Sequence, residues 1–207
     1  PPDPARALGL YVHIPFCRKR CSFCYFKVYT GKNSQDVSSY ISAIAEEARL
    51  LADREAIGGR TPEFLYVGGG TPSYLSESHV RALFRALEPL TGGVAPPAFT
   101  YECEPGTINE SKLEALLDLG VTRLSFGVEH MDDAMLSSNG RAHSRKQVLS
   151  TFALARQVGF EQINVDLLVG LAGETDAKWH KCVEDTIALE ADSVTLYQLE
   201  LPPNTVF

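Results

Sequence analysis

The sequence predicts an α/β fold, a partial (β/α)6 barrel of parallel strands. Three observations support this: six short apolar or alternating segments have the pattern of strands, helical patterns separate them, and the alternation repeats regularly. The repeat of about 30 to 40 residues is typical of βα units, in which strands joined through helices run parallel. Six units are fewer than the eight of a complete TIM barrel, so the sheet is expected to be a partial barrel or open.

The predicted strands are runs of apolar or alternating residues bounded by turn residues. A proline-rich N-terminal arm, residues 1–7, precedes them, and the barrel is expected to cover residues 8–207. The six strands are Leu8–Ile14, Glu63–Gly68, Ala98–Glu104, Arg123–Glu129, Gln162–Val169 and Ser193–Leu201.

The helices are predicted from apolar residues at helical spacing and from capping residues at their ends. The predicted helices are Val37–Arg54; His79–Leu87 with the cap Ser76; Ile108–Leu119 with a capping box of Thr107 and Glu110 and an end at Gly120; Arg145–Val158 between Ser144 and Gly159; and a helix from Thr175 or Asp176 to about Leu189.

Composition and charge exclude several classes of function. The chain has 207 residues, of which 44% are hydrophobic, and 19 Lys and Arg against 26 Asp and Glu give a net charge of −7. A basic nucleic-acid footprint is therefore not expected. The sequence has no apolar run of about 20 residues and no signal-peptide pattern, which predicts a cytoplasmic protein without a membrane span.

Polar residues occupy alternate positions near the carboxyl ends of five predicted strands. A period of two places each pair on one face of its strand, and ligands bind at the carboxyl edge of parallel sheets. The alternative is that these residues are simply solvated at the barrel mouth, but the pattern favours a ligand site. The pairs are Tyr11 and His13, Glu102 and Glu104, Ser125 and Glu129, Asn164 and Asp166, and Gln198 and Glu200.

Three of the five cysteines, Cys17, Cys21 and Cys24, lie in the loop directly after the first predicted strand. A disulfide would leave one of three thiols unpaired. Zinc needs a fourth ligand, which His13 could supply only in awkward geometry. The spacing favours an iron–sulfur cluster, in which three thiolates leave one iron open to a small molecule. The other two cysteines, Cys103 and Cys182, are expected to be buried packing residues.

This cysteine spacing after the first strand resembles the signature of the radical S-adenosylmethionine (SAM) superfamily. The wider strings, Tyr11-Val12-His13-Ile14-Pro15-Phe16-Cys17 and Gly68-Gly69-Gly70-Thr71-Pro72, resemble the oxygen-independent coproporphyrinogen III oxidase family and its haem-chaperone relatives. The resemblance covers about residues 8–207. It implies a radical SAM core, with a substrate domain expected after residue 207.

The resemblance also implies a chemistry. A [4Fe-4S] cluster on the three cysteines would chelate SAM, and one electron would cleave SAM to methionine and a 5′-deoxyadenosyl radical that abstracts hydrogen from a substrate. The family characteristically holds two SAM molecules. The implied partners are a small-molecule substrate and an electron donor such as flavodoxin or ferredoxin.

Further residues match positions that contact SAM in the family. We expect Tyr11 and Glu129 to lie at the reacting centre as well as in the binding site, and the hypothesis for Glu129, which replaces a family glutamine, is that it faces a cationic substrate group or acts as a base. The implied SAM contacts are Tyr11, Phe23, Gly69, Gly70, Thr71, Glu102, Glu129, Arg141 and Asp166.

Two positions depart from the family pattern. The oxidases have Gly and a further Cys after the third cysteine, where this chain has Tyr25 and Phe26. Oxidases and chaperones usually end the fourth strand in Gly-Val-Gln, where this chain has Glu129. Three functions therefore stay open: a radical SAM enzyme acting on a tetrapyrrole or another large conjugated substrate, a carbon-transferring methyltransferase or cyclopropanase that uses the second SAM, and a non-enzymatic haem chaperone.

Overall fold

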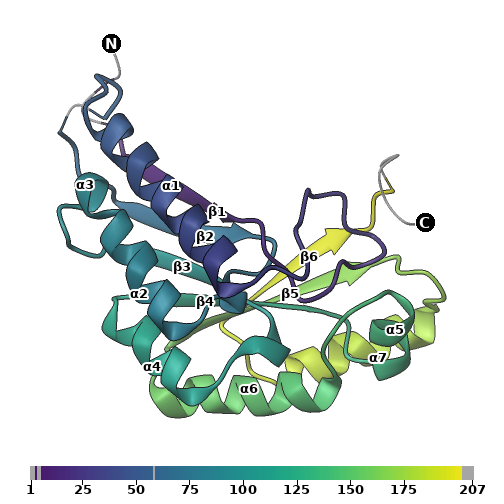
Figure 1. Cartoon of the computed structure of the whole chain (residues 1–207). Helices are drawn as coiled ribbons and strands as arrows, with labels where there is room; N and C mark the ends of the chain where they lie inside the picture. Colours follow the sequence, from purple (N-terminus) through teal and green to yellow (C-terminus); the bar gives the residue numbers. More distant parts are fainter. Residues whose placement is uncertain (1–2, 4–5, 58, 202–207) are drawn as a thin grey trace.

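A computed structural model describes residue 3, residues 6–57 and residues 59–201 of the chain. In this part, six parallel strands form one sheet in sequence order, which confirms the predicted α/β fold and is consistent with a partial barrel (Figure 1). The strands are β1 (Gly9–Ile14), β2 (Phe64–Gly69), β3 (Ala98–Cys103), β4 (Arg123–Glu129), β5 (Gln162–Val169) and β6 (Ser193–Gln198).

The first five strands match their predicted bounds to within one residue, but the sixth ends earlier than expected. Its last paired residue is Gln198, opposite Val169. The partner strand β5 ends there because Gly170 turns the backbone away with a φ of +91°. The Leu199 N–H still donates to the Val169 carbonyl, but residues 200 and 201 have no strand to pair with, and the prediction that the strand reaches Leu201 was wrong.

All five predicted helices are present, and the shorter elements were missed because one or two turns carry too little periodicity to detect. The α-helices are α1 (Ser34–Ala52), α2 (Glu77–Ala86), α3 (Glu88–Thr91), α4 (Glu110–Asp118), α5 (Asp133–Ser138), α6 (Arg145–Val158) and α7 (Asp176–Ile187), and the 3₁₀ helices are η1 (Pro72–Tyr74) and η2 (Pro105–Thr107).

Three helix starts differ from prediction, and the smallest change is at α2, which begins at Glu77, two residues before the predicted His79. The capping box of Thr107 and Glu110 was wrong: Asn109 caps α4 and accepts a hydrogen bond from the Lys112 N–H, and Thr107 ends η2. Helix α1 starts at Ser34, three residues before the predicted start, because its N-cap Asn33 forms a capping box with the residue three positions on. The predicted caps Ser76, Ser144 and Thr175 are confirmed.

The two faces of the sheet differ in polarity. The larger helices lie along one face, where side chains such as Val67, Phe99 and Val165 are fully buried (Figure 1). The alternate positions of the strands carry polar side chains, among them Glu102 and Asp166, on the opposite face. The predicted polar face therefore exists, and the loops after the strands gather at its carboxyl end (Figure 1).

Within the described ranges, no helix combines the length and apolar character needed to cross a bilayer. The predicted N-terminal arm lies partly outside the described residues, since residues 1, 2, 4 and 5 are not among them.

The corrected start of α4 can be tested by mutation. Asn109→Ala should lower the free energy of unfolding by about 1 kcal/mol, because the Lys112 N–H loses its side-chain acceptor. Glu110→Gln should cost less than half as much, since it changes only a charge near the helix start. Urea denaturation measures both, and a larger effect at Glu110 would contradict the assignment.

Candidate functional site

A cavity of about 610 Å³ opens at the carboxyl end of the sheet, and it brings together most of the residues singled out from the sequence. Its walls come from the loop before α1, the loop after β2, and the ends of β3 to β6. The lining residues include Phe23, Cys24, Gly69, Gly70, Thr71, Glu102, Glu104, Ser125, Glu129, Arg141, Asp166 and Tyr197.

The three cysteines lie on the loop between β1 and α1, residues 15–33, which we call the cysteine loop. Cys17 is buried, and its Sγ accepts a hydrogen bond of 3.3 Å from the Thr71 hydroxyl. The Sγ of Cys21 accepts one of 3.2 Å from the Arg141 guanidinium. Cys21 and Cys24 are half-buried, and the Cys24 N–H donates to the Cys21 carbonyl. Two sulfurs of the motif are therefore held by side chains from two other loops.

The donor set fits an iron–sulfur cluster. Burial raises the pKa of Cys17 to about 11, and the neighbouring Cys24 and Cys21 thiols raise it further. The thiolate form therefore requires a bound cationic centre, such as the iron of a cluster, to stabilise its charge. Among the described residues, no three His, Cys, Asp or Glu side chains converge on one metal ion. His13 instead shares a hydrogen bond of 3.0 Å with the Tyr11 hydroxyl, which does not support the zinc alternative. In a cluster, each thiolate binds a different iron, so the sulfurs can stand further apart.

The glycines after β2 let this loop approach the cysteine loop closely. The Gly70 N–H donates to the Ile14 carbonyl, and a Cβ on Gly70 would stand 2.9 Å from the Cys17 Sγ. Gly69 has a φ of +118°, which favours glycine, and its N–H points at the Glu102 carboxylate. The loop that the sequence predicted as a SAM contact is thus packed against the first cysteine.

Two half-buried carboxylates, Glu102 and Asp166, line the cavity. Glu102 accepts hydrogen bonds of 2.8 Å from the Tyr66 hydroxyl and 2.9 Å from the Gly69 N–H. Asp166 accepts from the Ser125 hydroxyl and from the Asn164 amide, both at 2.8 Å. Burial raises the pKa of both carboxyls, and the hydrogen bonds counteract this increase. Fixed carboxylates of this kind can bind ammonium or hydroxyl groups of a ligand.

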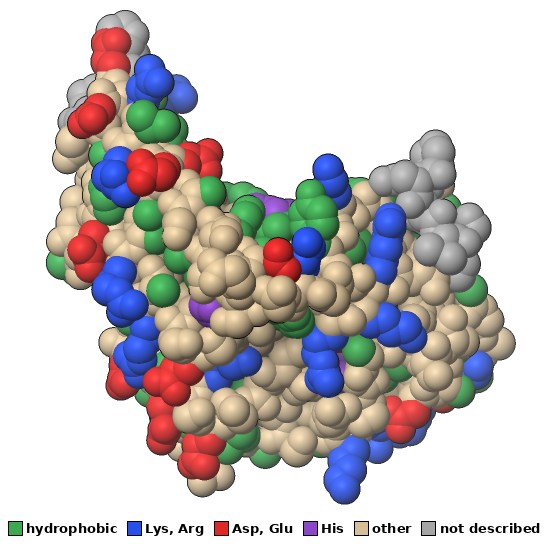
Figure 2. Space-filling model, viewed as in Figure 1, with side chains coloured by type: hydrophobic (Ala, Val, Ile, Leu, Met, Phe, Trp, Pro, Cys, Tyr) green, Lys and Arg blue, Asp and Glu red, His purple; other side chains and the backbone are tan. Residues whose placement is uncertain are grey.

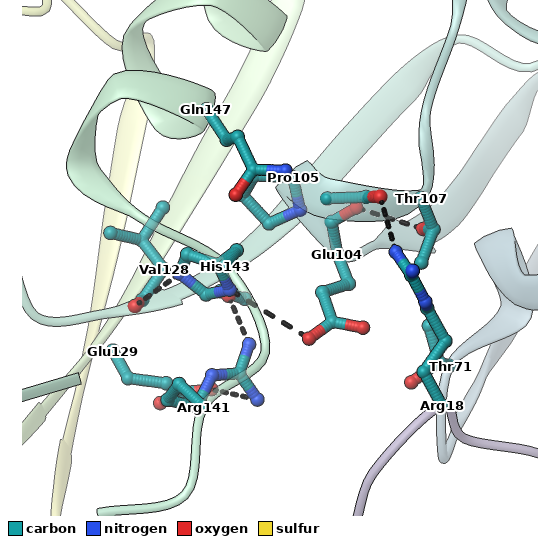
Figure 3. A network of polar contacts seen from close by, with 12 residues as sticks. Arg18, Thr71, Glu104, Pro105, Thr107, Val128, Glu129, Arg141, His143 and Gln147 are labelled. Carbon is teal, nitrogen blue, oxygen red and sulfur yellow. Dashed lines mark hydrogen bonds and ion pairs between the residues drawn. The ribbon is translucent and has the colours of Figure 1, made fainter. Parts of the chain in front are cut away.

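Arg141 connects the cysteine loop to β4. It donates to the Gly127 carbonyl as well as to the Cys21 sulfur, and its NH1 lies 3.8 Å from a Glu129 carboxylate oxygen. Figure 3 shows Arg141 between Glu129 and His143, with Glu104 beyond the histidine. The acidic surroundings raise the pKa of Arg141 although burial acts against it. The Nε of Arg141 is buried without a partner among the described residues, so this guanidinium retains one donor for a ligand.

Glu129 reaches the cavity because the backbone of β4 is irregular. The register shifts between Gly127 and Glu129, and Glu129 has a φ of +67°, which side-chain-bearing residues rarely adopt. Burial raises the pKa of Glu129 to about 7, with Arg141 lowering it and the carboxylate of Asp166 raising it further. A carboxyl that titrates near neutrality can carry or release a proton in this site.

The structure separates Tyr11 and Phe23 from one another. Phe23 lines the cavity and packs with Leu168 and Leu199, a position from which it can cover a ligand. Tyr11 lies on the edge strand β1, is 60% exposed and is not among the residues that line the cavity. Its ring lies 6.0 Å from that of Tyr66. The roles implied for Tyr11 and Glu129 stay predictions.

His143 is a site residue that the sequence did not indicate. Its Nε2 contacts the Val128 carbonyl, and its Nδ1 lies 3.7 Å from a Glu104 oxygen (Figure 3). Burial alone would raise the pKa of Glu104, but His143 and Arg141 together hold it below its ordinary value. Burial lowers the pKa of His143 itself. The only signal in the sequence that could have indicated His143 is its position two residues after Arg141.

Cys103 and Cys182 are both buried, as expected. Burial raises the pKa of each thiol, to about 11 for Cys182, so neither is a ready nucleophile.

The raised pKa of Glu129 predicts a pH-dependent effect on stability. Between pH 4.5 and about 7 the folded chain holds a proton on Glu129 that the unfolded chain has lost, so this residue's contribution falls as pH rises. Glu129→Gln has no titrating carboxyl and therefore does not lose stability in this way as pH rises. The free energy of unfolding of the variant, relative to wild type, should rise by about 2 kcal/mol from pH 5 to 8.

Urea denaturation at four pH values measures this difference. Asp192→Asn is the control: the Ile163 N–H and Arg156 hold the pKa of Asp192 below its ordinary value, so its stabilisation is already complete above pH 5 and the variant should show a flat difference. A flat difference for Glu129→Gln as well would contradict the assigned protonation.

Comparison with known proteins places these features in a family. A sequence model described as the radical SAM superfamily matches residues 11–186. The haem chaperone HemW of Bacillus subtilis is 35% identical over 201 residues, which cover 95% of this chain and 52% of that protein. The oxygen-independent coproporphyrinogen III oxidase of Paracoccus denitrificans is 31% identical over 194 residues, 92% of this chain and 42% of that protein. The chain spans about half the length of the curated relatives it matches.

Solved structures show the same similarity. Coproporphyrinogen III oxidase (HemN) from Escherichia coli, described as a radical SAM enzyme, superposes with a TM-score of 0.88 at 27% identity, over 99% of this chain and 46% of that one. The radical SAM methyltransferase TsrM from Kitasatospora setae has a TM-score of 0.65 at 19% identity, over 97% of this chain and 38% of that one, and shows a shared fold only.

Proposed function

The chain belongs to the radical SAM superfamily, with similarity to haem chaperones and oxygen-independent coproporphyrinogen III oxidases, and from this we propose that it cleaves SAM reductively at a [4Fe-4S] cluster. The observation that carries the proposal is the packing of the cysteine loop. The sulfurs of Cys17 and Cys21 accept hydrogen bonds from Thr71 and Arg141, and these two donors line the same cavity as Cys24.

When bound, the cluster supplies the single electron that splits SAM into methionine and a 5′-deoxyadenosyl radical. Cys17, Cys21 and Cys24 would hold it. The hydrogen bonds from Thr71 and Arg141 stabilise negative charge on two of the sulfurs.

The side chains of this chain then bind and orient the ligand. Glu102 and Asp166 are fixed acceptors for amino or hydroxyl groups, and Arg141 suits a carboxylate because its planar group can donate two hydrogen bonds. Phe23 covers the cavity and limits the access of water to a reactive species. Five acidic residues in the wall favour a cationic ligand such as SAM. A second SAM is part of this proposal.

We propose a tetrapyrrole or another large conjugated molecule as the second ligand. The support is the similarity to proteins named as haem chaperones and coproporphyrinogen oxidases. Haem trafficking without turnover is the alternative that the relatives' names favour most directly. Carbon transfer from the second SAM has no observation specific to it and enters as an outcome of the test. The specificity-setting domain expected after residue 207 and the cytoplasmic location remain predictions.

Anaerobic reconstitution with iron, sulfide, SAM and a reductant tests the first part. The wild type should bind about four irons per chain and form 5′-deoxyadenosine, while Cys17→Ala, Cys21→Ala and Cys24→Ala should each lose both. Cys182→Ala is the matched control and should keep the cluster, since that thiol lies buried on α7, away from the cavity. Tight zinc binding without a cluster would refute the proposal.

The reconstituted protein also separates the three functions. Haem binding with a Soret shift and no change in the haem indicates a chaperone. Release of CO₂ from a propionate indicates a decarboxylase, and transfer of label from methyl-labelled SAM into a product indicates carbon transfer. Failure to bind any tetrapyrrole would refute the proposed ligand class while leaving SAM cleavage standing.

A further inference from the structure

The cysteine loop differs in charge from the rest of the chain. Residues 15–33 contain five of the chain's 19 Lys and Arg residues and none of its 26 Asp and Glu residues. The chain as a whole is acidic, with a net charge of −7. The five basic residues are Arg18, Lys19, Arg20, Lys27 and Lys32.

These cations are presented at the surface. All five side chains belong to residues that are exposed or half-buried, and Figure 2 shows Lys and Arg side chains around the part of the surface that the cysteine loop occupies in Figure 1. Lys27 and Lys32 both lie over the exposed ring of Tyr29, with their Nζ atoms 5.8 and 5.9 Å from its centroid. Tyr29 therefore holds two positive charges close together.

Two further contacts fix positive charge next to the cluster ligands. The Arg20 guanidinium donates a hydrogen bond of 3.0 Å to the carbonyl of Cys24. The Arg18 guanidinium donates one of 2.8 Å to the carbonyl of Gly106 in η2 and so ties the loop to the body of the protein (Figure 3). The basic surface and the cysteines are thus parts of one short and anchored segment.

We propose that this basic surface of the cysteine loop is the docking site for an acidic protein that donates one electron, such as a flavodoxin. The inference rests on the proposed function, because SAM cleavage requires an external electron. In this step one electron leaves the reduced flavin of the donor and one enters the cluster, and no bond forms or breaks in this chain. Placing the donor over Cys21 and Cys24 keeps the path short, and these two cysteines are only half-buried.

Charge complementarity is what such a partner requires. Electron-transfer complexes are small and short-lived, so their association depends on electrostatic steering more than on buried area. Lys32 forms an ion pair of 3.7 Å with Asp36 of α1, so the steering rests mainly on Arg18, Lys19, Arg20 and Lys27. This local cluster of cations on an otherwise acidic chain orients an acidic donor toward the cysteine loop and repels it elsewhere. A nucleic acid would also bind a basic surface. A long polyanion, however, would extend beyond the cysteine loop and be repelled by the acidic remainder of the chain.

The test compares two double variants with the same change in net charge. Lys19→Glu with Lys27→Glu reverses charge on the cysteine loop, and Arg85→Glu with Lys146→Glu reverses it at exposed positions on α2 and α6. The dissociation constant of oxidised flavodoxin is measured on the cluster-loaded protein by calorimetry at several salt concentrations. We expect the loop variant to bind about tenfold more weakly with a reduced salt dependence, and the control to match wild type.

Turnover gives an independent readout. With reduced flavodoxin, the loop variant should form 5′-deoxyadenosine about tenfold more slowly at sub-saturating donor. With photoreduced deazariboflavin, a small neutral reductant, it should match wild type. An unchanged dissociation constant in the loop variant would overturn the docking site, as would an equal loss in the control. Tighter binding of polyuridine RNA than of flavodoxin would assign the surface to nucleic acid and also overturn it.

The two proposals fail in different ways. If wild type forms no 5′-deoxyadenosine with the small reductant, the proposed function is wrong. If it does so and the loop variant still binds flavodoxin normally, only the docking site is wrong.

Discussion

The rest of the site depends on the interactions of one side chain, the guanidinium of Arg141. It joins the Cys21 sulfur to the Gly127 carbonyl and stands 3.8 Å from Glu129, so one side chain fixes the cysteine loop against β4. A buried charge is stabilising only where its partners remain in place. The carboxylates of Glu129 and Glu104 also rely on it, since both share the cavity with no other arginine among its lining residues.

The backbone of β4 contributes to the same arrangement. A bulge shifts the register before Glu129, and the left-handed φ of this residue costs of order 1–3 kcal/mol. Such strain persists where the surroundings fix it, and here the Arg141 guanidinium, 3.8 Å from the Glu129 carboxylate, contributes to this. Glutamate at this position differs from the glutamine of the resembled family in holding a proton near pH 7, which makes the charge of the cavity variable.

Local signals made most of the fold and the centre of the site predictable. Each strand has its own apolar pattern, and the cysteines, the glycines after β2 and the strand-end carboxylates all lie next to a strand end. The errors have local causes too: Thr107 and Asn109 are both acceptable caps two residues apart, and only the turn of η2 decides between them. His143 was not predictable, because its contact with Glu104 joins residues far apart in the sequence.

The separation of charge across the cysteine loop unites the two proposals. The cavity beside the loop is lined by five acidic residues, which favour a cationic ligand, and the loop itself carries five basic residues, which favour an acidic partner. Because opposite charges serve the two ligands, neither competes for the surface of the other. The net charge of the chain hides this arrangement, since a sum over all residues cannot show that one segment of 19 residues has the opposite sign.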